Sequence, residues 1–210
     1  MIPTGIIHVN DVFMTARKPR GARRSASKRI FDSASALFYR KGIRAVGVEA
    51  IAAEAETTKM SLYRSFPSKD ELVAEWLRDH DAKFWRSWEA MSRRHPGEAR
   101  EQLRAAFALL EKHVADPSAR GCPMANAAVE ITERDHPARK VIEAHKMKLR
   151  SRLAELCRVM GVREAARLAD ELFLLMEGAH VSATLGVRGP ARRVAHAADA
   201  LIDAHLPKAS

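Results

Sequence analysis

The chain has 210 residues, of which 47% are hydrophobic, and a net charge of +10. This length suits one or two folded domains, and the apolar content excludes an intrinsically disordered chain. The longest strongly apolar run, at 172–176, is far shorter than the roughly 18 residues of a membrane span, and the first residues lack the pattern of a signal peptide.

The positive charge is concentrated near the N-terminus. Between residues 17 and 69 there are thirteen Lys and Arg but only four Asp and Glu, so this segment holds nine of the ten net charges. Such a concentration is typical of a site that binds a polyanion, nucleic acid above all. A basic tail that only aids solubility and a membrane-surface segment are alternatives, although no strongly amphipathic helix carries the cluster.

The first predicted helix follows a segment without helical period. Residues 1–24 are expected to form a mobile basic tail. Ser25 or Ser27 can cap a helix that Gly42 ends, and a shorter helix follows over 48–55.

A third short helix follows closely. Thr57 or Thr58 can cap it, and Pro67 ends it. Ser68 and Glu71 then form a capping box, which predicts the start of a long helix. Three short helices within about 45 residues, with a tight second turn, describe a helix-turn-helix module.

The remainder of the chain is predicted to be helical as well. Pro and Gly residues separate its periodic segments, and no stretch alternates with period two for long enough to form a strand. We expect a helix from 69 to about 94, another over 98–115, and a short one that ends at about 133. Three more are expected over 137–160, 164–187 and 189–205. The predicted fold class is therefore all-α.

The segment from Ala55 to Leu72, AETTKMSLYRSFPSKDEL, resembles the DNA-binding signature of the TetR family of transcriptional regulators. The matching elements are Ser61, Leu62-Tyr63, Phe66 and Ser68-Lys69-Asp70. The stretches at 38–43 and 48–52 match the first two helices of that family, and 120–127 is similar to a sequence common in one of its branches.

This resemblance implies an organisation and a mechanism. Residues 25–69 would form the helix-turn-helix DNA-binding domain, and 70–210 a helical domain for effector binding and dimerisation. A homodimer would place two recognition helices in successive major grooves of a near-palindromic double-stranded DNA operator. A small molecule would release it, so we expect a repressor rather than an enzyme, with no cofactor and no membrane partner.

A recognition helix at about 58–66 would bury Leu62 and Phe66 and turn its polar residues outward. Lys59, Thr57, Thr58 and Ser61 can reach phosphates or base edges, and the resemblance implies that Tyr63 and Lys69 hold the phosphate backbone. The predicted DNA-binding residues are Arg44, Gly47, Thr57, Thr58, Lys59, Ser61, Tyr63, Arg64 and Lys69.

Three positions depart from the usual family pattern. Glu56 stands in the turn where the family carries Gly, which predicts a strained positive φ at a cost of about 1 kcal/mol. Met60 replaces a common Gly, and Val46-Gly47 replaces a pair of Thr, which removes one hydroxyl contact to phosphate.

The effector is expected to be largely apolar, with one or two polar anchor points. Aromatic and Met side chains supply an adaptable wall, although any single one of them is more readily explained as core. The predicted pocket residues are Trp85, Trp88, Phe107, Cys122, Met124, Asn126, Met147, Phe173, Met176, Glu177 and His180.

The last two predicted helices carry too many apolar residues for one buried face each, which predicts a four-helix dimer interface. The residues concerned are Leu168, Leu172, Phe173, Leu175, Met176, Val181, Leu185, Val194, Ala197, Ala198, Leu201 and Ile202.

The sequence also contains two pairs of Glu and His at helical spacing. Glu133 with His136 and Glu177 with His180 have the i, i+3 spacing of di-iron bundles, with Glu130 as a further carboxylate. His136 directly precedes Pro137, which is a poor position for a metal ligand inside a bundle, so we predict neither a metal site nor catalytic residues. A protein that compacts DNA without sequence preference would explain the charge, but not the nearly neutral helical remainder.

The two cysteines, Cys122 and Cys157, are too few for a disulfide framework and predict a reducing compartment, the cytoplasm. Cys122 lies near a predicted helix start, where a thiol can become reactive. A thiol- or metal-responsive sensor regulator is therefore the alternative function, and a catalytic helical-bundle protein is a less favoured one. A small buried packing group is the simpler interpretation of Cys122, as it is of Cys157.

Overall fold

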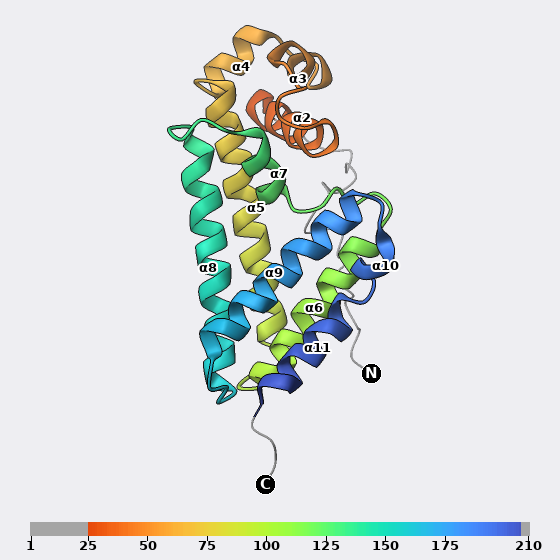
Figure 1. The fold of residues 1–210 in the computed structure, drawn as a ribbon. Coiled ribbons are helices and arrows are strands. Elements are labelled where there is room, and N and C mark those ends of the chain that lie inside the picture. Colours follow the sequence, from red (N-terminus) through yellow and green to blue (C-terminus); the bar gives the residue numbers. More distant parts are fainter. Residues whose placement is uncertain (1–24, 207–210) are drawn as a thin grey trace, which may run out of the picture. The chain divides into compact units, whose positions relative to one another are not determined.

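The computed structural model describes residues 25–206, and within that range it contains helices and no strand. The predicted basic tail at 1–24 lies outside the described residues. The chain divides into two compact units. Figure 1 labels the helices of both. The described part of the first unit covers 25–83 and Asn126–Ile142, and that of the second covers Phe84–Ala125 and 143–206.

The first unit begins with three short helices. α2 (Ala26–Lys41) is capped by Ser25, whose hydroxyl accepts the N–H of Lys28, and it ends at Gly42, where φ is 88°. α3 (Val48–Glu54) and α4 (Lys59–Ser65) follow, and each packs against the other and against α2. The predicted caps at Ser25 and Thr58 and the predicted stop at Gly42 are confirmed.

The core of these three helices is formed by apolar residues that recur at helical spacing in the sequence. Ile30, Ile51 and Leu62, one from each helix, are fully buried. The start of α5 (Lys69–Ser92) joins this core through Trp76, whose ring centroid lies 5.5 Å from that of Phe38. Removing such surface from water is the main stabilisation of so small a module.

The first unit also contains a segment from much later in the chain. Asn126–Ile142 includes the end of α7 (Pro123–Glu130) and the start of α8 (Pro137–Val159). The carboxylate of Glu130 accepts the backbone N–H of Arg44 at 2.8 Å, so this late segment is bonded to the loop between α2 and α3. The sequence pattern did not predict this contact.

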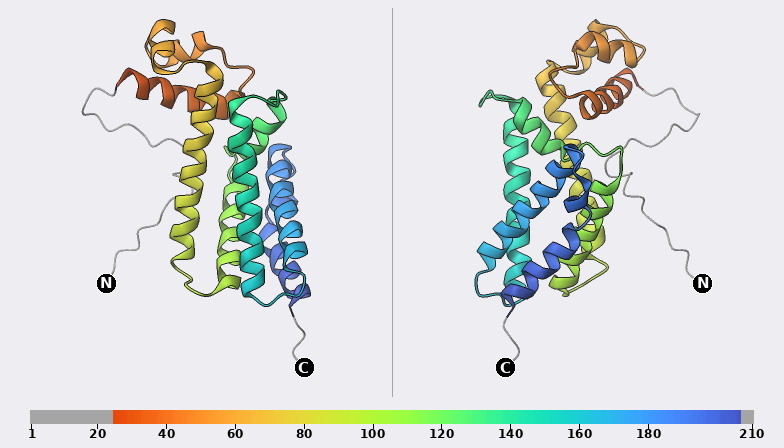
Figure 2. Two further views of the ribbon diagram at one scale, coloured as in Figure 1. Left: turned by 90° about the vertical axis from the view of Figure 1, so that its left-hand side faces the viewer. Right: turned by 45° about the vertical axis from the view of Figure 1, so that its right-hand side comes forward.

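In the second unit, α6 (Ala99–Ala115), α9 (Ala165–Thr184) and α11 (Val194–His205) pack against one another, as Figures 1 and 2 show. Leu103, Leu168 and Ile202 are buried in their shared core. No helix in the described range is both long and apolar enough to cross a membrane.

Two predicted boundaries in this unit are wrong. The helix expected over 164–187 ends at Thr184, because Gly186 has a φ of 78° and closes the helix with a tight turn. The single helix expected over 189–205 is divided into α10 (Arg188–Ala191) and α11. A carboxylate oxygen of Glu111 on α6 accepts the N–H of Ala195 at 3.1 Å, which satisfies a free amide at the start of α11.

Candidate nucleic-acid interface and candidate effector site

The outer face of α4 carries polar and basic side chains. Lys59, Tyr63 and Arg64 are exposed, and Tyr63 retains 46% of its accessible surface, so it is not a packing residue. Leu62 on the inner face is fully buried, as predicted, whereas Phe66 is half-buried. The helix thus presents donors to solvent from a fixed backbone, which suits a polyanionic ligand.

The first turn of α4 is held by side chains that were predicted to contact DNA. Thr58 Oγ1 accepts the N–H of Ser61 at 3.2 Å and lies 3.1 Å from the Ser61 hydroxyl. Lys59 Nζ donates to Glu49 Oε1 on α3 at 2.7 Å. This hydrogen bond lowers the pKa of Glu49 and raises that of Lys59.

The turn between α3 and α4 has the strain that the sequence predicted. Glu56 has a φ of 48°, the one positive φ outside glycine among the described residues. Its N–H bonds to the carbonyl of Ala53 and that of Thr57 to Ala52, the pattern in which glycine is preferred at this position. Arg29 of α2 donates from Nε to the carbonyl of Ala55 at 3.1 Å, which fixes the turn from the side of the first helix.

Two predicted phosphate contacts have partners inside the first unit. Lys69 is half-buried, and its Nζ donates to the carbonyl of Ile43 at 2.7 Å. Burial lowers its pKa, against the opposing effects of Asp70 and Glu130. Its ammonium has two further N–H donors, so holding this loop does not prevent a contact to phosphate.

Arg44 is exposed, and its guanidinium meets the segment at 126–142. It donates to Thr132 Oγ1 at 3.3 Å and forms an ion pair of 3.6 Å with Glu133. Gly47 is exposed at the start of α3 and Thr57 is half-buried in the turn. Arg44 is therefore directed to acidic neighbours that sequence spacing could not reveal.

Most of the predicted effector residues lie in the second unit, where they form several groups. Trp85, Trp88, Phe107 and Met176 belong to its hydrophobic core, and Phe107 is fully buried. The two indole rings lie 5.9 Å apart, and Trp85 lies 6.1 Å from the imidazole of His145 on α8. Met124 is also fully buried. For these residues the core interpretation is sufficient in the structure as it stands.

Two further members of the predicted set lie apart from this core. Met147 is 70% exposed, so the prediction that it lines an internal pocket is wrong. The inward face of α8 is formed by His145, Leu149 and Leu153, and Met147 lies on the opposite side of the helix. Asn126 belongs to the first unit rather than the second.

Cys122 and Glu177 meet at a residue that was not predicted, Lys146 on α8. Its Nζ lies 3.5 Å from Cys122 Sγ and 2.5 Å from Glu177 Oε1, and 5.7 Å from the centre of the Phe173 ring. Burial alone would lower the pKa of Lys146, but Cys122 and Glu177 together outweigh it and raise that pKa. The helical spacing of Lys146 to Leu149 and Leu153 could have indicated its inward position.

His180, the last predicted pocket residue, lies one turn beyond Glu177. Its ring centroid is 5.7 Å from that of His113 on α6. Burial lowers the pKa of His113, against a hydrogen bond with the backbone of Gly121, the residue before Cys122. Polar groups from α6, α8, α9 and the residues before α7 thus converge inside the second unit.

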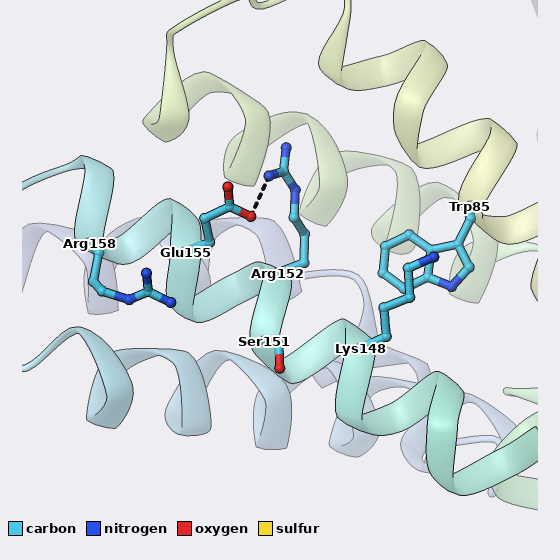
Figure 3. Close-up of a pocket in the computed structure, with 6 residues that line it drawn as sticks. All are labelled: Trp85, Lys148, Ser151, Arg152, Glu155 and Arg158. Carbon is cyan, nitrogen blue, oxygen red and sulfur yellow. Dashed lines mark hydrogen bonds and ion pairs between the residues drawn. The ribbon is translucent and has the colours of Figure 1, made fainter. Parts of the chain in front are cut away.

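A separate open depression of about 430 Å³ lies along α8 (Figure 3). Lys148 Nζ lies 4.1 Å from the centre of the Trp85 ring, and Arg152 pairs with Glu155 at 2.6 Å. Its lining residues are Trp85, Lys148, Ser151, Arg152, Glu155 and Arg158, of which only Trp85 was predicted.

The Glu and His residues with the spacing of a metal site have other partners in the structure. Glu177 pairs with Lys146, Glu133 with Arg44, and His136 Nδ1 accepts the N–H of Ala138 at 3.1 Å. Within 25–206, no group of three or more His, Cys, Asp or Glu side chains is placed to hold a metal ion.

Comparison with known proteins gives a consistent result. Residues 30–76 match the family model described as bacterial regulatory proteins of the tetR family, and residues 99–200 match the tetracyclin repressor-like C-terminal domain. No curated protein shows a significant match to the chain.

Solved structures of several regulators share the fold. A TetR-family transcriptional regulator from Streptomyces coelicolor is 27% identical, with a TM-score of 0.81 over 87% of this chain and 96% of that one. A TetR transcriptional regulator from Streptomyces avermitilis is 28% identical, with a TM-score of 0.76 over 87% and 98%. A TetR-family regulator from Agrobacterium tumefaciens, 20% identical, has a TM-score of 0.73 over 87% and 98%, and this likeness concerns the fold alone.

Proposed function

The chain belongs to the TetR family of DNA-binding transcriptional regulators, which are not enzymes, and we propose that it is a ligand-released repressor. It binds a near-palindromic operator as a homodimer. Residues 25–69 contact DNA, and residues 70–210 bind the effector and the second protomer.

The observation that carries this proposal is the exposed face of α4. Lys59, Tyr63 and Arg64 extend from a short helix whose other side is anchored by the buried Leu62. A rigid helix with outward donors can enter a major groove, where Lys59 and Ser61 meet base edges and Tyr63 meets phosphate. The concentration of positive charge over 17–69 supports the same partner.

The dimer proposal rests on one face of α9. Leu174, Val181 and Leu185 are 68%, 52% and 72% exposed, and their spacing places them on one side of the helix. Gly178 lies between them, with open space where a side chain would be. A second copy would cover this apolar stripe. By contrast, Val194, Ala198 and Ile202 of α11 are buried within the protomer. The proposed dimer interface is therefore formed mainly by α9.

The effector is proposed to be largely apolar with one or two polar anchors. The buried Nε1–H of Trp88 has no acceptor among the described residues, and neither has the hydroxyl of Ser92, one turn further along α5. A buried donor without a partner costs about 1 to 3 kcal/mol, which a ligand carrying an acceptor would relieve. The core must open to admit such a ligand, because Trp88 is only 6% exposed.

Release requires that the effector binds the DNA-incompetent state more tightly than the competent one. A preference of about 100-fold corresponds to about 2.7 kcal/mol of coupling. One helix, α5, contains both Lys69 and Trp88 and is a direct route for this coupling.

Selection of genomic DNA fragments with the purified protein tests this proposal. We expect a near-palindromic site whose half-sites are about one helical turn or a multiple of it apart. Compounds can then be titrated while tryptophan fluorescence and operator affinity are followed together, and affinity should fall as fluorescence changes. Recovery of fragments without a shared sequence would overturn the operator proposal, and ligand binding without loss of affinity would overturn the release mechanism.

A further inference from the structure

The second unit contains a buried cluster of a thiol, an ammonium and a carboxylate. Cys122 is 7% exposed, and Lys146 lies between its sulfur and Glu177, at 3.5 Å and 2.5 Å. The three side chains come from the loop before α7, from α8 and from α9, so the tertiary fold brings them together.

The thiolate is the nucleophilic form of cysteine, and the ammonium of Lys146, 3.5 Å from the sulfur, is placed to hold the negative charge of that form. Cys122 also directly precedes Pro123, the first residue of α7. Glu177 competes with the sulfur for the charge of Lys146, so it moderates this activation.

The second cysteine provides an internal contrast. Cys157 is fully buried in the hydrophobic core, and burial raises its pKa to about 11. Both cysteines are free thiols. The chain therefore contains one thiol beside a cation and one in an apolar core.

We propose that Cys122 is a covalent capture site for small, soft electrophiles of the α,β-unsaturated carbonyl class. The thiol proton leaves to solvent, and the thiolate attacks the β-carbon, forming the C–S bond as the C=C π bond breaks. The electron pair moves to the carbonyl oxygen as an enolate, and a proton from Lys146 or water then adds to the α-carbon. The net reaction adds S–H across the double bond and needs no oxidant and no second thiol.

The surroundings fit a small reagent of this class. The side chains of Lys146 and Glu177 are 18% and 24% exposed, so two of the three members of the cluster retain some contact with solvent. The Phe173 ring, 5.7 Å from the Lys146 ammonium, adds an apolar surface for the carbon skeleton. A group added at a site with so little free space must displace its neighbours.

This inference rests on the proposed function only for its consequence, which is that the adduct lowers operator affinity. α7 begins beside Cys122 and ends at Glu130, whose carboxylate bonds the backbone of Arg44. Displacement at the first end of this eight-residue helix is therefore expected to disturb the bonds made at its last residue.

The test treats the full-length protein with N-ethylmaleimide and follows intact mass and peptide maps over time. We expect one adduct, on Cys122, with Cys157 unlabelled in the folded protein. Cys122→Ser should abolish the adduct and Cys157→Ser should preserve it. Labelling of Cys157 at an equal or higher rate would overturn the proposal.

Two variants change the charges around the Cys122 thiol in opposite directions. Lys146→Met should slow labelling roughly tenfold, and Glu177→Gln should accelerate it, because the ammonium then faces the sulfur alone. Lys148→Met, which removes a cation from the same helix, should leave the rate unchanged. If Lys146→Met does not fold, the test rests on Glu177→Gln alone. An unchanged or lower labelling rate in that variant would show that Lys146 does not promote the reaction of Cys122.

Operator binding is then measured before and after labelling. A loss of affinity in the wild type that is absent in Cys122→Ser supports a regulatory role. Labelling on Cys122 without loss of affinity would overturn that role but keep the capture site. Failure of the unlabelled protein to bind any operator would count against the proposed function alone.

Discussion

Lys59, the first residue of α4, forms an ion pair with Glu49 of α3, with 2.7 Å between Nζ and Oε1. Both side chains are largely exposed, so this pair contributes little to stability. It does determine where the ammonium lies before DNA arrives, since a phosphate and Glu49 compete for the same charge.

Glu49→Gln should therefore strengthen operator binding. The variant removes the competing acceptor and a negative charge that would face phosphate, so we expect about a threefold to tenfold gain at low salt. Binding measured over a salt series should also become steeper, by about one counterion. Glu54→Gln, a charge change on the same helix at the ion pair with Arg40, is the control and should change affinity less.

Glu56→Gly should stabilise the protein. Glu56 occupies a φ of 48°, which costs a residue with a side chain about 1 kcal/mol relative to glycine. Urea unfolding should show a gain of about that size. Glu56→Ala keeps the strain and removes the charge, so an equal gain in that variant would show that charge, not backbone strain, is responsible.

The apolar stripe of α9 can be tested by Leu174→Glu. Leu174 is 68% exposed in the protomer, so the change should spare the fold while it places a charge in the proposed dimer interface. Sedimentation should show a dimer for the wild type at micromolar concentration and a monomer for the variant. Met147→Glu alters a similarly exposed apolar residue on α8 and should remain a dimer. A monomeric wild type would contradict the dimer proposal.

The pH dependence of stability should reveal His113. Burial lowers its pKa from the ordinary value of 6.5, so the unfolded chain takes up the proton more readily than the folded one. As pH falls through about 6.5, His113 therefore favours unfolding, and its destabilising effect grows toward acid. Thermal melts between pH 7.5 and 5.5 should show a smaller loss of stability for His113→Gln than for the wild type.

His196→Gln, at an exposed position on α11, is the control for that comparison. It should show the same pH dependence as the wild type. An identical pH profile for His113→Gln would mean that the imidazole of His113 is equally protonated in the folded and unfolded states.

The helix boundaries near the N-terminus could be predicted because their signals are local. Ser25 and Thr58 cap their helices through bonds to residues three positions later, and Gly42 ends α2 through its own backbone conformation. The strain at Glu56 could be predicted in the same way, because Glu56 stands at a position where glycine is expected and has a positive φ.

The sequence predictions fail where contacts with distant segments determine the local structure. The break before α11 depends on Glu111, 84 residues earlier, and the position of Arg44 depends on Glu130 and Glu133. Met147 suits a pocket by residue type, but the helical period places its neighbour Lys146, and not Met147, on the inward face. The cluster of Lys146 with Cys122 and Glu177 joins three segments and has no signature within any one of them.

Sequence-specific binding of duplex DNA through α4 can be measured in a competition assay. A labelled operator fragment is bound by the protein, and unlabelled operator or a scrambled duplex of equal length and composition is added. The operator should compete at concentrations lower by roughly a thousandfold or more. Tyr63→Ala should weaken binding to both duplexes, because its proposed contact is to phosphate. Equal competition by the two duplexes would show that the protein does not recognise a specific operator sequence.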